Sequence, residues 1–364
     1  MPLIWCSISS HGYGHAAQLV PVLNALGRRI ADLRVVLRTT VPREFFAGRL
    51  EMPWEMSPAE QDIGCIQRGP LSIDVAATWN AYQTFHADWS TRVAKEAQAI
   101  RSRQPSLILA NISHLAVAAG EAAGVPVAGL CSLSWDQILE PLLAADPEQR
   151  PAQISILEVI RRAYALADVM IRPAPGLPMP AFKDVRDVPP ILQAVVPEPH
   201  ALRSALGASV GEPIVLVGFG GVALESFPVD RLNDMAPYRF LVDRHNGVVH
   251  DRVRSVDSVS IPFGTLLASA DIVLTKPGYS TVVEAVAHRR PVVYVRRYNF
   301  ADEQPLVDYL HQYGTAVELS HEDFIHGRWQ HALSQVQQVL PATRHAPPPH
   351  GAAAAATVLE QFLT

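Results

Sequence analysis

Short apolar runs rich in β-branched residues alternate along the chain with longer stretches of helical periodicity. In the first half this pattern predicts strands at 3–8, 33–39, 106–110 and 125–130, and helices over 16–29 and 114–123. Strands separated by helices at this spacing form parallel sheets with crossover helices. The first half is therefore predicted to be an α/β domain.

The alternation stops in a proline-rich stretch, residues 172–199, where no regular element is expected because proline lacks a backbone donor. Strand-like runs then resume at 213–221, 238–243, 259–263, 271–275 and 291–295, and a second proline-rich break at 345–351 precedes an alanine-rich helix. The predicted units are a Rossmann-like domain over 1–175, a linker over 176–200, a second Rossmann-like domain over 201–344, and a break with a terminal helix over 345–364. We expect a ligand between the two parallel sheets, at the carboxyl ends of their strands.

Composition narrows the class of protein. A chain of 364 residues with 49% hydrophobic content can bury two ordinary cores. Its net charge of −5 leaves no basic footprint, so nucleic acid is not an expected partner. The widely spaced Cys6, Cys65 and Cys131 fit neither a disulfide framework nor a zinc site. With no signal-like start and no apolar run of about eighteen residues, we expect a cytoplasmic protein without a transmembrane segment.

The loop SSHGYGHAAQLVPVL, residues 9–23, joins the first predicted strand to the first helix. Gly12 and Gly14 permit close backbone approach to a ligand, and the following helix start offers free N–H groups to an anion. His15 directly precedes the predicted helix start, and the ordinary pKa of a histidine suits a general base at neutral pH. His11 is expected to contact the loop or an acceptor. The alternative is a glycine turn with solvated histidines. The spacing does not match a dinucleotide fingerprint.

A second glycine turn, KPGYSTVVEA, follows the strand predicted at 271–275. The backbone N–H groups of Gly278, Ser280 and Thr281 suit phosphate oxygens, and Glu284 suits ribose hydroxyls. The charge of Lys276 can neutralise that of a pyrophosphate. The alternative is that Thr281 and Glu284 form a capping box and that Lys276 is solvated.

Four further loops follow strand ends and supply weaker candidates. In the second half, Gly220 and Gly221 are expected to face the phosphates, while Asp302, Glu303 and Gln304 offer acceptors and donors to sugar hydroxyls. In the first half, the candidates for the same site are Asn111, His114, Trp135 and Asp136. The alternatives are ordinary strand-to-loop glycines, an acidic loop that opens a helix, and a Trp135 that packs in the core.

Six stretches in order along residues 4–340 together resemble one family. They are HGYGHA (11–16), SLSWDQI (132–138), PMPAFKDVRDVP (178–189), GFGG (218–221), KPGYSTVVEA (276–285) and VRRYNFADEQP (295–305). The chain resembles the glycosyltransferase-like N-terminal half of plant-type L-arabinokinases and their bacterial stand-alone relatives. The proline-rich stretch is telling, because no generic nucleotide site requires it.

The resemblance implies a GT-B architecture, with a nucleotide-sugar held mostly by the C-terminal domain. In the wider MurG-like group a glycine turn and a helix glutamate hold the donor, and Gly278, Ser280, Thr281 and Glu284 match them. Gln304 matches a glutamine that contacts the donor sugar, and Phe263 stands where backbone contacts the base. The first loop also resembles that of the hydrolase PseG, whose loop histidine activates water, and His15 corresponds to it.

The resemblance also departs at two points: Asn111 stands where the family usually has Asp, and no sugar-kinase half is present to carry over kinase activity. The expected function is a metal-independent glycosyltransferase that uses a nucleotide-diphosphate sugar, such as a UDP-sugar, and an unidentified acceptor. No cofactor beyond this co-substrate and no metal ion are expected. The alternatives are a nucleotide-sugar hydrolase or epimerase on the same fold, and a non-catalytic module that binds a nucleotide-sugar.

Overall fold

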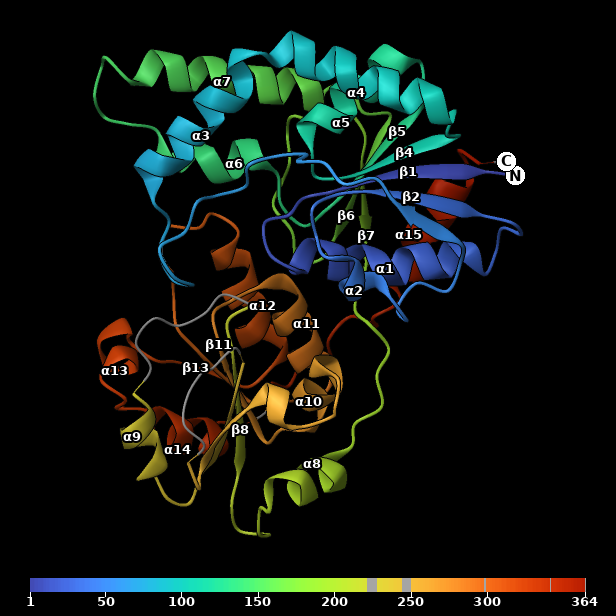
Figure 1. Ribbon diagram of the computed structural model, residues 1–364. Helices are drawn as coiled ribbons and strands as arrows, with labels where there is room; N and C mark the ends of the chain where they lie inside the picture. The colour runs from blue at the N-terminus through green and yellow to red at the C-terminus, as the bar shows by residue number, and fades with distance from the viewer. Residues whose placement is uncertain (221–227, 244–249, 298, 341, 364) are drawn as a thin grey trace.

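The computed structural model describes residues 1–220, 228–243, 250–297, 299–340 and 342–363, and it contains two parallel sheets (Figure 1). The first is seven-stranded, with strand order β3-β2-β1-β4-β5-β6-β7. Its strands are β1 (Leu3–Ile8), β2 (Arg34–Arg38), β3 (Trp54–Met56), β4 (Leu107–Asn111), β5 (Val127–Leu130), β6 (Val169–Pro173) and β7 (Val185–Val188). Most of these strands are buried on both faces, which is why they are apolar runs without alternation.

Helices cover both faces of this sheet. One face carries α3 (Val75–Ala87), α4 (Trp89–Arg103), α5 (His114–Ala123), α6 (Trp135–Leu139) and α7 (Arg150–Tyr164), with a short 3-10 turn at Glu140–Leu142 (Figure 1). The other face carries α1 (Gly14–Gly27) and α2 (Arg43–Phe46). One hydrophobic core therefore lies on each side of β1 and β4.

The second sheet is six-stranded, with order β10-β9-β8-β11-β12-β13. Its strands are β8 (Ile214–Gly218), β9 (Arg239–Val242), β10 (Val253–Ser255), β11 (Ile272–Thr275), β12 (Val292–Tyr294) and β13 (Ala316–Glu318). One face packs against α8 (Pro199–Leu206), α10 (Phe263–Ser269), α11 (Tyr279–Ala287) and α12 (Glu303–Tyr313). The other packs against α9 (Val229–Asn233), α13 (His321–Ile325) and α14 (Gln330–Gln338). These two sheets confirm the predicted pair of α/β halves.

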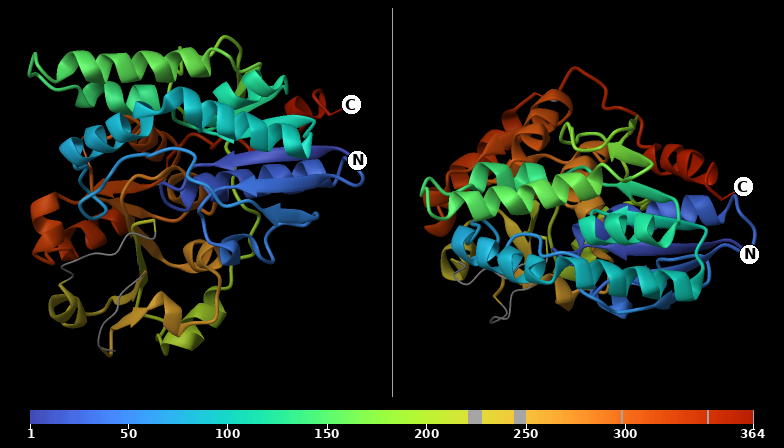
Figure 2. Two further views of the ribbon diagram at one scale, coloured as in Figure 1. Left: turned by 45° about the horizontal axis from the view of Figure 1, so that its top comes forward. Right: turned by 90° about the horizontal axis from the view of Figure 1, so that it is seen from above.

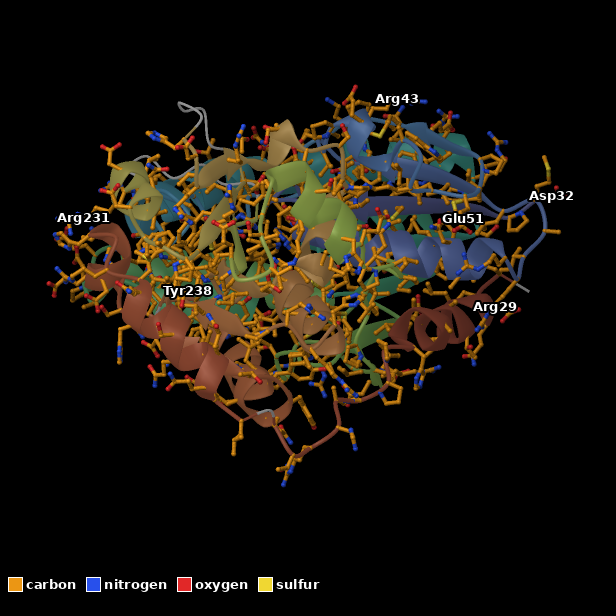
Figure 3. The ribbon with its side chains drawn as sticks, turned by 90° about the horizontal axis from the view of Figure 1, so that it is seen from below. Arg29, Asp32, Arg43, Glu51, Arg231 and Tyr238 are labelled. Carbon is orange, nitrogen blue, oxygen red and sulfur yellow. The ribbon has the colours of Figure 1, made fainter. Side chains whose placement is uncertain are left out.

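The C-terminal helix α15 (Gly351–Glu360) returns to the first half and packs against α1, β6 and β7. The chain termini therefore lie close together (Figure 2). Arg29, at the end of α1, fastens this helix by donating to Thr357 Oγ1 at 2.6 Å and to the Ala353 carbonyl at 2.9 Å (Figure 3). A Cβ at Gly351 would lie 1.9 Å from the Pro189 carbonyl oxygen, so only glycine fits where the two interdomain segments cross.

Three local predictions were wrong. The proline-rich stretch contains the edge strand β7 and the start of α8, because prolines flank the strand and an edge strand has fewer backbone donors to satisfy. The run at 259–263 is not a strand, since Pro262 is the N-cap of α10 and the edge strand β10 lies earlier. The first helix begins at Gly14, two residues before the expected start. The exact domain boundaries stay predictions. Among the described residues, no helix is long and apolar enough to cross a membrane.

Candidate functional site

Loops from both halves meet at the carboxyl ends of the two sheets. A Cβ built on Gly12 would lie 3.9 Å from the carbonyl oxygen of Gly220, and one on Gly220 would lie 3.8 Å from Cε of Lys276. Gly12 and Gly220 have φ values of +78° and +71°, which side-chain-bearing residues rarely adopt. The loops after β1, β8 and β11 therefore approach one another across the domain boundary, and both glycines serve that approach.

His15 lies in the first turn of α1 and is 8% exposed. Its Nδ1 is 2.7 Å from Oδ1 of Asn111, whose Nδ2 donates to Oε1 of Gln18 at 3.2 Å. Because the Asn111 oxygen can only accept, Nδ1 of His15 carries the hydrogen and the lone pair remains on Nε2. Burial lowers the pKa of His15 to about 4, against the opposing effect of the Asn111 hydrogen bond. The imidazole is therefore neutral at pH 7, with a fixed tautomer.

Both ring nitrogens of His11 contact a second segment of the first half, at Cys65 and Gln67. The Cys65 backbone N–H donates to Nδ1 at 3.2 Å, so Nε2 carries the hydrogen. Nε2 of Gln67 lies 3.0 Å from Nε2 of His11, and turning this amide by 180° places Oε1, which has no hydrogen-bond partner among the described residues, where it can accept that hydrogen. Burial lowers the pKa of His11 to about 3, with smaller contributions from His15, Lys276 and Arg297. His11 thus joins its loop to the segment around Cys65, and His15 is joined to Asn111 through Nδ1.

Trp135 is buried and packs against both histidines, with ring centroids 5.4 Å from His11 and 5.7 Å from His15. Its Nε1–H donates to Oδ2 of Asp62 at 2.9 Å, and the Ser9 hydroxyl donates to Oδ1 of Asp62 at 2.8 Å. Burial raises the pKa of Asp62 to about 6. Sequence reasoning missed Asp62, because it follows no strand and belongs to no motif.

The histidines and Trp135 form the wall of the site that comes from the first half. The start of α11 forms the wall that comes from the second half. The N-cap is Gly278, no side chain caps the helix, and the first backbone bond runs from the Val282 N–H to the Gly278 carbonyl at 2.9 Å. The N–H groups from Tyr279 to Thr281 therefore lie outside the helical ladder and are available to an anion. The capping-box alternative is wrong, because Thr281 lies inside the helix rather than at its cap.

Two basic side chains, Lys276 and Arg297, lie beside the start of α11. Burial lowers the pKa of Lys276 to about 7, and Arg297 adds to that effect while Asp302 and Glu303 oppose it. Arg297, a second residue that sequence reasoning missed, donates from Nη2 to the Pro277 carbonyl at 2.8 Å. Its guanidinium also lies 3.8 Å from the centroid of the Phe300 ring. Arg297 thus clamps the glycine turn and brings positive charge to it.

The remaining donor candidates lie around α11. Burial raises the pKa of Glu284 to about 7, against the opposing charge of Arg49 from the first half. Phe263 opens α10, and its Cζ lies 3.0 Å from a Cβ built on Gly218, so its ring packs on the end of β8. Gln304 is exposed and bridges Arg296 and Asp308 through its amide, at 2.7 Å to each. Ser280 is partly exposed in the first turn of α11.

Several predicted site residues lie elsewhere. Glu303 is 1% exposed, and its carboxylate binds Arg296 and Arg297, so it positions those arginines rather than facing a sugar. His114 is buried in a ring stack, with Nε2 3.1 Å from Nε2 of His86. Asp136 is buried 3.5 Å from Nε of Arg161. Both point away because α5 and α6 turn these side chains into the helical layer.

The last two candidates are glycines of the predicted loops. Gly14 is exposed at the start of α1, with open space around a built Cβ. Gly221 lies outside the described residues. Among the residues that the structure describes, no three His, Cys, Asp or Glu side chains gather as cation ligands.

A cavity of about 420 Å³ lies next to the site and is lined from both halves. Pro141 and Leu142 form the wall from the first half, and the other wall is formed by Arg296, Asn299, Phe300, Ala301 and Gln304. The second wall follows β12, the strand beside β11, and Arg297 connects it to the glycine turn at Pro277. The cavity is therefore one strand away from the start of α11.

No family model matches the chain. In sequence it is similar to L-arabinokinase from Arabidopsis thaliana, at 26% identity over 340 residues, which are 92% of this chain and 32% of that protein. The chain thus spans about a third of the length of this relative. The similarity confirms the predicted resemblance.

Several solved structures of similar fold are glycosyltransferases. The calicheamicin glycosyltransferase CalG4 gives a TM-score of 0.65 at 16% identity, over 100% of this chain and 98% of that one. UGT89C1 of Arabidopsis thaliana, complexed with quercetin, gives 0.61 at 14% identity, over 99% and 93%. Spinosyn rhamnosyltransferase SpnG, complexed with thymidine diphosphate, gives 0.54 at 14% identity, over 100% and 96%. These likenesses establish the fold: the two sheets have the GT-B arrangement.

Proposed function

We propose that this chain is a glycosyltransferase that moves a sugar from a nucleoside-diphosphate sugar to a hydroxyl acceptor, with His15 as the general base. The observation that carries the proposal is the meeting of two unlike walls. A neutral imidazole with a fixed tautomer belongs to the first half. An uncapped helix start with Lys276 and Arg297 belongs to the second. A base and an anion site on opposite sides are what displacement of a diphosphate requires.

In the proposed reaction, Nε2 of His15 takes the proton from the acceptor hydroxyl. The acceptor oxygen forms a bond to the anomeric carbon as the bond from that carbon to the diphosphate breaks. The nucleoside diphosphate leaves with the electron pair of that bond. Asn111 holds Nδ1–H throughout, so the proton arrives at the nitrogen that faces away from the amide.

The leaving diphosphate gains negative charge, and the start of α11 is suited to stabilise it. Three backbone N–H groups, the helix dipole and the two cations act in a partly buried setting, where electrostatic interactions are stronger than in water. Glu284, with a pKa raised to about 7, is the proposed acceptor for ribose hydroxyls. The cavity between Leu142 and Gln304 is the proposed place for the sugar, because its size suits a monosaccharide and its lining mixes apolar and amide groups.

The bound thymidine diphosphate in the spinosyn rhamnosyltransferase supports the choice of ligand class. The similarity to L-arabinokinase adds a link to sugar chemistry, although the chain covers only 32% of that relative.

A thermal-shift panel of UDP-, GDP-, dTDP- and ADP-sugars at millimolar concentration tests the proposal. We expect one nucleotide class to raise the melting temperature, because a ligand that binds only the native state stabilises it by mass action. The matched variant Lys276→Met should lose most of that shift. No stabilisation by any member would contradict the proposal, and release of free sugar without an acceptor would assign a hydrolase instead.

A further inference from the structure

The amide of Asn111 orients His15 but carries no charge to stabilise the imidazolium that forms when His15 takes a proton. We propose that Asp62 supplies this charge through the indole of Trp135, which packs against His15. Asp62 is thus a positioning and electrostatic residue of the site and not a catalytic residue, because it touches neither the substrate nor His15. This inference rests on the proposed function.

The contacts form a continuous chain from carboxylate to imidazole. Oδ2 of Asp62 accepts from Nε1–H of Trp135 at 2.9 Å, and the indole ring packs against His15 with centroids 5.7 Å apart and planes at 45°. Asp62 and Trp135 are 6% and 1% exposed, so water does not screen this pair. A carboxylate on the indole N–H increases the electron density of the ring, and an electron-rich ring attracts a neighbouring cation.

The second oxygen of Asp62 fixes the same loop that carries the histidines. Oδ1 accepts from the Ser9 hydroxyl at 2.8 Å, and Oγ of Ser9 in turn accepts from the His11 backbone N–H at 3.3 Å. His11 packs edge-on against the indole at 5.4 Å. Asp62 therefore holds the indole and the loop in one geometry while it supplies the charge.

The charged groups around the two histidines include cations that disfavour a protonated histidine, and a nearby carboxylate opposes that effect. Lys276 and Arg297 are close enough to lower the pKa of His11, so positive charge already faces this loop from the second half. Asp302 and Glu303 lie beside those cations, and Arg297 pairs with both. On the side of the first half, Glu60 and Asp62 are the nearby acids, and Asp62 is the one in contact with Trp135.

Asp62→Asn isolates the charge, because its amide can keep both hydrogen bonds. The Asn oxygen can accept from the indole while its NH₂ group donates to the Ser9 hydroxyl, which is able to accept. We expect the variant to fold, to keep its thermal shift with the donor, and to lose about tenfold in kcat with little change in KM for the donor. Asp234→Asn, an exposed position in the second half, is the matched control.

The pH dependence separates charge from structure. Since the pKa of Asp62 is about 6, wild-type kcat should fall as the pH falls through 6, and the variant should lack that step. Adding Asn111→Asp should restore kcat to Asp62→Asn, since it returns a carboxylate to His15. A kcat like that of wild type, or a lower kcat that keeps the step, would overturn the proposal.

An NMR titration tests the same inference without turnover. The Nε1–H resonance of Trp135 and the ring resonances of His15 should both shift near pH 6 in the wild type. Both shifts should vanish in Asp62→Asn, and the His15 shift should vanish in Trp135→Phe. A His15 shift that survives Trp135→Phe would refute transmission through the indole. If these shifts occur in a protein without transferase activity, the proposed function fails and the electrostatic link stands.

Discussion

Asn111→Asp replaces the amide beside His15 with a carboxylate and so adds a negative charge there. In the wild type, His15 Nδ1 and Asn111 Oδ1 are 2.7 Å apart, and Asn111 is fully buried. A carboxylate there would lie roughly 4 Å from the centre of an imidazolium. At an effective dielectric constant of about 20 the attraction is about 4 kcal/mol, which corresponds to about three pKa units. The pKa of His15 should therefore rise from about 4 towards neutrality.

A pH–rate profile of sugar transfer measures this change. The acid limb that reports His15 should move to higher pH, and the plateau kcat should rise about tenfold, because the base is stronger and its cation is paired. Stability should change as well. In the wild type the unfolded histidine binds a proton below about pH 6.5 and the folded one only near 4, so stability falls as the pH drops between these values. In the variant that loss should largely disappear.

Asn233→Asp makes the same chemical change in the second half, where Oδ1 of Asn233 accepts from the Arg252 backbone N–H, and it should leave the profile unmoved. If Asn111→Asp lowers kcat without moving the acid limb, the assignment of His15 as the base held by Asn111 is refuted.

Three further predictions follow from the two walls. Lys276→Met should weaken binding of the nucleoside diphosphate about 10- to 100-fold in calorimetry, because charge-assisted hydrogen bonds to phosphate are worth about 1.5–3 kcal/mol, and equal affinity would contradict this role. As the pH falls through about 7, protonation of Glu284 weakens its ribose contact while protonation of Lys276 strengthens its phosphate contact, so in a Lys276→Met background donor affinity should fall through about pH 7, and adding Glu284→Gln should remove that dependence. His15→Gln should remove a stability loss of about 3 kcal/mol that the wild type suffers between about pH 6.5 and 4, as measured by urea unfolding at each pH.

The fold was predictable because its signals are local. Buried parallel strands such as β4 and β11 are uninterrupted apolar runs, and strand ends of parallel sheets necessarily share an edge. The short edge strands were missed, since β7 and β10 bury few residues and carry weak patterns. The packing of α15 on the first half was also unpredictable, because no local pattern says which half a terminal helix covers.

The structure brings together predicted candidates where a residue follows a strand within a glycine turn, as for the loops that carry His15 and Lys276. His114 and Asp136 also follow strands, but helix geometry turns both into the helical layer. Glu303 matched a sugar-reading pattern, yet the two adjacent arginines occupy its carboxylate. Asp62 and Arg297 act through contacts distant in sequence, so spacing alone could not reveal them.

The most direct test of the account compares wild type with His15→Gln on the nucleotide-sugar that the thermal-shift panel selects. Nucleoside diphosphate release and sugar transfer are measured together, with donor affinity measured separately. The account predicts unchanged donor affinity and a loss of transfer of about 100-fold or more, the usual contribution of a general base. Transfer by His15→Gln at the wild-type rate would contradict it.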